Sequence, residues 1–310
     1  PERTTCESNM IRSASLAVAL FVLPAMAQIP TIQLALHLRA DRDVELQGQH
    51  VACWSDTARD LKASQDVAAA RPILVRDGLN GNPVVRFAGK QALNLRQPDS
   101  LGFPQLDAYT LAEVFRATGN DCGTLFCQGG GSTAARPAQL YVTASNVGAV
   151  VGGGMHESSR QAESGVALLL RRNNRCEIWL NGRQCDAFPA RPPPPSTCDV
   201  LIGARRQTAG NEGIAYALHG DIAEILVYRR ALANEEIRAL CRHLGTRYGF
   251  RPPRSLVHQI EEAEAAGADL FPLAERAREL AESNQLDDTA AEATARLLRS
   301  EDPFVRGVAE

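Results

Sequence analysis

Lysine is almost missing from this sequence, since Lys62 and Lys90 are the only two among 33 basic residues. We interpret the excess of arginine as a compositional bias, not as an arginine recognition surface. Aromatic residues make up only 5% of the chain, and the net charge is −3. A protein that binds nucleic acid normally carries a basic excess, so we expect no nucleic-acid partner.

Long apolar runs are also missing. No stretch reaches the roughly 20 apolar residues that cross a bilayer, so we expect no membrane span. A shorter apolar segment, Ala14–Val22, follows the charged start Met10–Arg12 and precedes Ala25-Met26-Ala27. This order is typical of a secretory signal peptide, although a core strand or helix is the alternative. We predict upstream residues and a signal peptide over 1–27, and a protein that is secreted, periplasmic or at the cell surface.

The sequence has no pair of short Cys-x-x-Cys clusters, which argues against metal binding by cysteine. Seven cysteines follow the predicted cleavage site: Cys53, Cys122, Cys127, Cys176, Cys185, Cys198 and Cys241. In an exported chain they can oxidise, but an odd number leaves one unpaired. Cys122 and Cys127 could close a local loop. Cys176 and Cys185 flank a predicted Asn181-Gly182 turn that sets Cys185 opposite Ile178, so the pairing stays open.

Short apolar runs separated by Gly, Asn and Pro extend from Ile32 to Tyr228. Many short strands at such spacing predict an all-β sandwich or barrel. After the last strand the apolar period becomes helical, which predicts a helix over 234–248 with Asn234 as N-cap and Gly249 as its left-handed end. Residues 251–310 contain no strand pattern and show several helical stripes. We predict an α-helical tail there, the start of a truncated further region.

Several motifs resemble those of laminin-G-like (concanavalin A-like) jellyroll domains. They are the closing strand and helix over Leu218–Phe250, and Leu36–Asp41, Trp54-Ser55-Asp56, Asn80–Gly89 and Ile178–Gly182. The resemblance implies a two-sheet antiparallel jellyroll over residues 28–250, closed by a short helix. Two departures from the family pattern, Gly129–Gly131 and Pro192–Pro195, are predicted loop insertions, flexible in the first case and stiff in the second.

The same architecture includes laminarinase-type glucanases, which carry Glu-x-Asp-x-x-Glu on one strand. Retaining hydrolysis needs two carboxylates about 5–5.5 Å apart. The nearest match here is His219 to Glu224, in which histidine replaces the first carboxylate. Ser100, Ser132 and Ser145 also lack a Gly-x-Ser-x-Gly setting. We therefore predict no catalytic residue and no enzyme.

Glycan binding calls for aromatic rings beside polar side chains. Trp54 and Trp179 lie in strand-like runs and are predicted core residues. The candidates for ligand contact are Tyr109, Tyr141, His156 and Tyr216. The resemblance also implies a structural Ca²⁺ at the sheet edge, with Asp221 as a ligand. The alternative is that Asp221 accepts hydrogen bonds from a turn.

The sequence thus predicts a non-catalytic recognition or adhesion module of an exported protein. Its partner would be a carbohydrate or a cell-surface protein. Two alternatives stay open: a glycan-cleaving enzyme, and a structural spacer for a catalytic domain beyond Glu310.

Overall fold

The computed structural model describes residues 29–96, 101–119, 122–133, 136–144, 146–192, 196, 198–208, 213–250, 256–282, 294–300, 305 and 307. The predicted signal peptide and the prolines at 193–195 lie outside the described residues. The predictions of export and of a stiff proline loop are therefore not tested by the structure.

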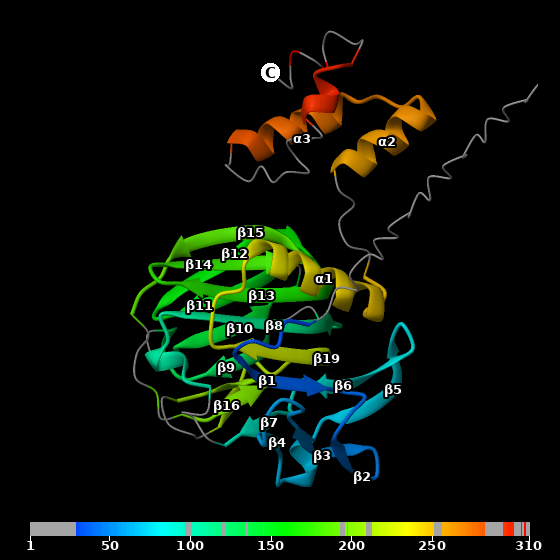
Figure 1. The fold of residues 1–310 in the computed structure, drawn as a ribbon. Coiled ribbons are helices and arrows are strands. Elements are labelled where there is room, and N and C mark those ends of the chain that lie inside the picture. Colours follow the sequence, from blue (N-terminus) through cyan, green and yellow to red (C-terminus); the bar gives the residue numbers. More distant parts are fainter. Residues whose placement is uncertain are drawn as a thin grey trace, which may run out of the picture.

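The chain folds into an antiparallel β-sandwich of two layers, with one helix against the outside of one layer (Figure 1). Layer A comprises β1 (Leu34–Arg39), β5 (Ile73–Leu79), β6 (Asn82–Ala88), β8 (Ala108–Ala117), β13 (Ser164–Arg172), β14 (Arg175–Leu180), β15 (Arg183–Pro189) and β19 (His219–Tyr228). Layer B comprises β4 (Lys62–Ser64), β7 (Leu93–Leu95), β9 (Gly123–Gln128), β10 (Ala138–Val142), β11 (Asn146–Val151), β12 (Gly154–Gln161) and β16 (Val200–Ile202). The all-β prediction is confirmed.

Hydrogen bonding continues from one layer to the other. Strand β3 (His50–Ser55) pairs with β4 of layer B, with β5 of layer A and with β2 (Val44–Gln47). Short β17 (Arg205–Arg206) and β18 (Ile214–Ala215) form a separate pair beside layer B. Two 3-10 turns, Ala68–Ala70 and Phe103–Gln105, complete the sandwich.

Two apolar clusters follow from the alternation of side chains along the strands. In β8, Leu111 and Phe115 lie in the cluster between the layers, whereas Ala112 and Val114 lie in the cluster between layer A and helix α1 (Asn234–Tyr248). Burying one large aliphatic side chain contributes about 1.5–3 kcal/mol, so a helix that buries several is held firmly. Helix α1 therefore covers an apolar part of the outer face of layer A.

Helix α1 has the predicted bounds, but its cap differs. The N-cap is Ala233, whose N–H donates to Glu236 Oε2 at 2.9 Å, and Asn234 already belongs to the helix. The glutamate accepts from the N-cap N–H, a different donor from the N2 or N3 N–H that an Asn side chain at the N-cap would accept from. Gly249 ends the helix with φ of 78°, as predicted.

The Asn181-Gly182 hairpin forms, with positive φ at both residues. Its register differs from the prediction, because a bulge sets Asp186 opposite Ile178 and leaves Cys185 inside the bulge. Neither disulfide considered from the sequence, Cys122–Cys127 or Cys176–Cys185, is formed.

Two helices of the tail, α2 (Leu256–Ala266) and α3 (Phe271–Glu282), bury a cluster of their own that includes Ile260, Ala274 and Ala277. This agrees with the predicted helical tail, while its role as the start of a further region stays a prediction. In the part of the chain that the structure describes, no helix has the length and apolar character needed to cross a membrane.

Candidate functional site

Polar side chains gather on the outer face of layer B. Thr124 of β9 and Gln139 of β10 alternate with the core residues Leu125 and Leu140, so they point away from the core. The Gln139 amide donates to Thr124 Oγ1 at 3.2 Å. Farther along β10, the Tyr141 hydroxyl lies 3.3 Å from Glu157 Oε1 on β12. The strands thus hold an amide, two hydroxyls and a carboxylate on one face.

Two arginines and a second tyrosine extend this group. Arg136, just before β10, donates from Nη1 to Gln139 Oε1 at 3.0 Å. The guanidinium of Arg205, in β17, lies 4.3 Å from the ring centre of Tyr216. We refer to Thr124, Arg136, Gln139, Tyr141, Glu157, Arg205 and Tyr216 as the layer B cluster.

The members of the layer B cluster differ in exposure. Thr124, Gln139 and Tyr141 are buried, Arg205 is partly exposed and Glu157 is exposed. The Tyr216 ring is 54% exposed, and its residue has a φ of 50°. A bulky residue in the left-handed region is uncommon and strained, and such strain is found at binding sites more than elsewhere. The cluster therefore presents an exposed tyrosine, held by a strained backbone conformation, above a buried polar layer.

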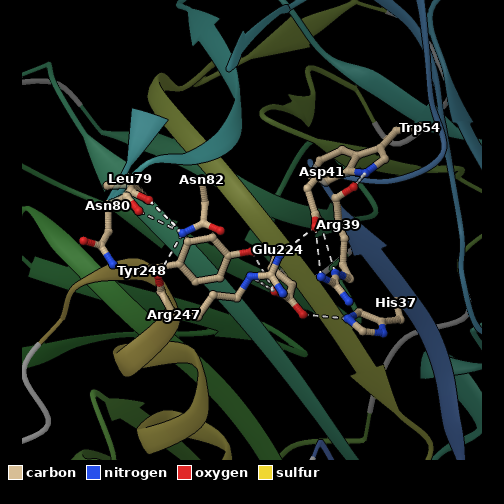
Figure 2. A network of polar contacts seen from close by, with 10 residues as sticks. All are labelled: His37, Arg39, Asp41, Trp54, Leu79, Asn80, Asn82, Glu224, Arg247 and Tyr248. Atoms are coloured by element: carbon tan, nitrogen blue, oxygen red, sulfur yellow. Dashed lines mark hydrogen bonds and ion pairs between the residues drawn. The ribbon is translucent and has the colours of Figure 1, made fainter. Parts of the chain in front are cut away.

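The outer face of layer A also carries polar residues, but they serve the helix. Figure 2 shows Glu224 of β19 between His37 and Tyr248, with His37 Nε2 2.6 Å from Oε1 and the Tyr248 hydroxyl donating to Oε2 at 2.7 Å. Beside them, Arg247 Nη2 lies 2.7 Å from Asp41 Oδ2. Burial first, and then the charge of Glu224, raises the pKa of Tyr248, so its hydroxyl keeps the proton that it donates. The network ties α1 to β1 and β19.

Glu224 is fully buried by these contacts, so a substrate cannot reach the carboxylate that the sequence places last in its incomplete glucanase motif. Catalysis by Glu224 would require α1 to move away from layer A and expose the carboxylate.

Asp221 does not have the surroundings predicted for a calcium ligand. Arg86 donates to Oδ1 from Nε at 2.7 Å and to Oδ2 from Nη2 at 3.1 Å, and both Nε and Nη2 of Arg116 donate to Oδ2. Asp221 is buried, and two guanidinium groups oppose a cation beside it. No group of three or more His, Cys, Asp or Glu side chains suited to a metal occurs among the described residues. Asp221 is a hydrogen-bond acceptor, as the alternative had it, but its donors are arginines instead of a turn.

The four predicted ligand residues do not lie together. Tyr109 is fully buried in the core between the layers, in edge contact with Phe103, so its ring is closed to a ligand. His156 lies in β12, and its ring stacks on Phe188 of β15. Tyr141 and Tyr216 both belong to the layer B cluster. Tyr216 is exposed and stays a candidate for ligand contact, whereas Tyr141 is buried and holds Glu157 by a hydrogen bond.

Sequence reasoning missed the arginines of the cluster. Arg136 and Arg205 stand in no motif and lie 69 positions apart in a chain rich in arginine. The one local signal is the Gly129–Gly131 run, which the sequence predicts as a flexible loop insertion. In the structure Gly130 pairs with Arg206, and a Cβ on Gly130 would lie 2.1 Å from the Thr208 carbonyl oxygen. The glycines permit a close approach of two chain segments.

No protein-family model and no curated protein matches the sequence. Solved structures similar to the chain include Trypanosoma rangeli sialidase in complex with sialic acid, at 16% identity over 71% of this chain and 34% of that chain, with a TM-score of 0.45. The same sialidase with the inhibitor DANA has 14% identity over 69% of this chain and 33% of that one, with a TM-score of 0.48. The CBM40 domain of Ruminococcus gnavus IT-sialidase bound to α2,3-sialyllactose has 17% identity over 51% of this chain and 96% of that chain, with a TM-score of 0.41.

This chain spans about a third of the length of the sialidases that it matches. The prediction that the chain is not an enzyme is contradicted here, because sialidases are among the structures similar to it. That prediction is withdrawn. At these identities and TM-scores, ligand and activity must be argued from the residues themselves.

Proposed function

We propose that this protein recognises carbohydrate through the layer B cluster. The observation that carries the proposal is the difference between the two outer faces: on layer A, α1 covers an apolar cluster and Glu224 is fully buried beneath it, whereas layer B bears polar groups beneath an exposed tyrosine ring. A sugar offers hydroxyls along its edge and C–H groups on its face. The exposed carboxylate of Glu157 and the partly exposed guanidinium of Arg205 complement the hydroxyls, and the Tyr216 ring complements the C–H groups. The buried amide and hydroxyls beneath them belong to the supporting polar layer.

Tyr216 is the contact residue that this proposal makes testable. We expect Tyr216→Ala to weaken binding to the saccharides that the wild type selects from a glycan array by about tenfold, equivalent to roughly 1.4 kcal/mol. Val67→Ala, which removes another exposed apolar side chain, is the matched control and should bind as the wild type does. A wild type that selects no glycan, or a Tyr216→Ala variant that binds as tightly as the control, would refute the proposal.

Cleavage of the bound glycan is the second candidate function, favoured by the pair Tyr141 and Glu157. The exposed Glu157 carboxylate can take the proton of a water that attacks the anomeric carbon, while the glycosidic bond breaks and the departing oxygen takes a proton from solvent. Tyr141, which is buried, positions that carboxylate through its hydroxyl. Burial first, and then the charge of Glu157, raises the pKa of Tyr141. The phenol therefore keeps its proton and donates it in the hydrogen bond to Glu157.

For cleavage we expect release of free sugar from an oligosaccharide that the wild type binds. At saturating oligosaccharide, Glu157→Gln should reduce that release at least a hundredfold, the lower range for general-base catalysis. Glu163→Gln supplies a control with the same chemical change outside the cluster. Equal release of free sugar by the wild type and by Glu157→Gln would refute cleavage as a function.

Two finer points stay proposals. Membership of the laminin-G-like jellyroll family is supported by the motifs at Asn80–Gly89 and Leu218–Phe250, and by the sandwich that contains them. Export is supported by the sequence pattern ending at Ala27. Both are consistent with a carbohydrate or a cell-surface partner outside the cell.

A further inference from the structure

The two arginines of the layer B cluster converge on one carbonyl group. Nη2 of Arg136 donates to the carbonyl oxygen of Gly131, and Nη1 of Arg205 lies 3.4 Å from the same oxygen. Their other acceptors are also neutral: Gln139 Oε1 for Arg136, and the Arg206 carbonyl oxygen, at 2.9 Å, for Arg205. Two positive charges are thus brought together around a single dipole.

Within the described ranges, no carboxylate forms a hydrogen bond or an ion pair with Arg136 or Arg205. By contrast, the converging arginines of layer A, Arg86 and Arg116, share the carboxylate of Asp221. Arg136 is only 6% exposed, and its Nε is buried without a hydrogen-bond partner. Burial, followed by the charge of Arg205, lowers the pKa of Arg136. Each effect marks a cation that lacks a counter-charge among the residues that the structure describes.

The backbone around Gly131 maintains this arrangement. Gly129 and Gly131 have φ values of 94° and 63°, and Gly130 forms a bridge to Arg206. Because a side chain at Gly130 would strike the Thr208 carbonyl, the approach of the two segments depends on glycine. The arginines are thus held together by backbone packing, and an anion between them would relieve their repulsion.

We propose that Arg136 and Arg205 form a subsite for the carboxylate of an acidic saccharide, whose ring lies against Tyr216. This inference rests on the proposed function and adds the substrate class. Arg205, which is partly exposed, contacts the carboxylate, and its planar fork matches the two carboxylate oxygens. Arg136 lies beneath it as a positioning residue that holds the Gly131 carbonyl and adds positive potential.

The test compares a neutral sugar with its carboxylate-bearing derivative. Calorimetric titration of the wild type with lactose and with α2,3-sialyllactose should show at least tenfold tighter binding of the second. Raising NaCl from about 0.05 to about 0.5 M should weaken only the binding of sialyllactose, because salt screens the charge contact. This salt comparison needs no variant, so a folding defect cannot obscure it.

Arg205→Met should remove the preference for sialyllactose over lactose. Arg76→Met, an exposed arginine on β5, is the matched control and should keep the preference. Equal affinity of the wild type for the two sugars would overturn the carboxylate subsite while the proposed function stands. Tighter binding of sulfated lactose than of sialyllactose would overturn the assignment to a carboxylate, and binding of neither charged nor neutral sugar would overturn both proposals.

Discussion

Replacing Glu113 with methionine is expected to stabilise the protein at neutral pH. Glu113 lies in β8 between Leu111 and Phe115, which both belong to the core between the layers. It is fully buried, and neither carboxylate oxygen has a hydrogen-bond partner. Leaving a buried polar group unsatisfied costs about 1–3 kcal/mol, so Glu113→Met should raise the free energy of unfolding by about that amount.

The same residue predicts the pH dependence of stability. Burial raises the pKa of Glu113 well above its ordinary value of 4.5, so the folded protein keeps a proton that the unfolded chain releases. The stability linked to that proton is fully present below pH 4.5 and is lost as the pH rises through the folded-state pKa. The loss approaches 1.36 kcal/mol per pH unit within that window.

Urea unfolding of wild type, Glu113→Met and Glu113→Gln between pH 4 and pH 8 measures both effects. The increase in the free energy of unfolding caused by Glu113→Met should grow with pH. Glu113→Gln, which also cannot titrate, should show the same weaker dependence of stability on pH. A Glu113→Met variant that is less stable than wild type at pH 8, with an unchanged profile, would contradict this account of the core.

Removing the charge of Asp221 is expected to cause the largest loss of stability. Breaking a buried ion pair costs about 3–5 kcal/mol, and the lower end applies because Arg86 and Arg116 retain access to water. Asp221→Asn should therefore lower the free energy of unfolding by about 3 kcal/mol. For a domain of this size, that corresponds to a fall in melting temperature of about 6–12 °C.

Asp77→Asn on β5 is the matched control, because Asp77 is exposed. It should melt within about 1 °C of the wild type. The loss in Asp221→Asn should be the same in calcium and in chelator. A loss that appears only when calcium is present would restore the calcium role and contradict the ion pair.

The sandwich could be predicted because its signals are local. Alternating apolar residues defined the strands, the Asn181-Gly182 turn fixed one hairpin, and the periodicity after Ala233 fixed α1. The bulge at Cys185 could not be read in the same way. A bulge adds one residue on one strand only, and no side chain in the local sequence requires it.

The candidate site was predicted only in part, because its members meet through tertiary packing. Tyr141 and Tyr216 were recognised as polar aromatic residues, and both belong to the layer B cluster. Tyr109 was chosen on the same grounds, yet its strand turns it into the core. Nothing in the sequence around Arg136 and Arg205 shows that the two share a carbonyl oxygen. The contact depends on how the glycine run and β17 pack together.

The central claim is that carbohydrate binds on the outer face of layer B. Backbone amide chemical shifts, recorded by NMR during titration with α2,3-sialyllactose, test it most directly. The account predicts saturable changes centred on residues 123–128, 138–142 and 213–217, with α1 and β1 unaffected. Changes confined to α1 and β1, or the absence of any saturable change at millimolar saccharide, would contradict it.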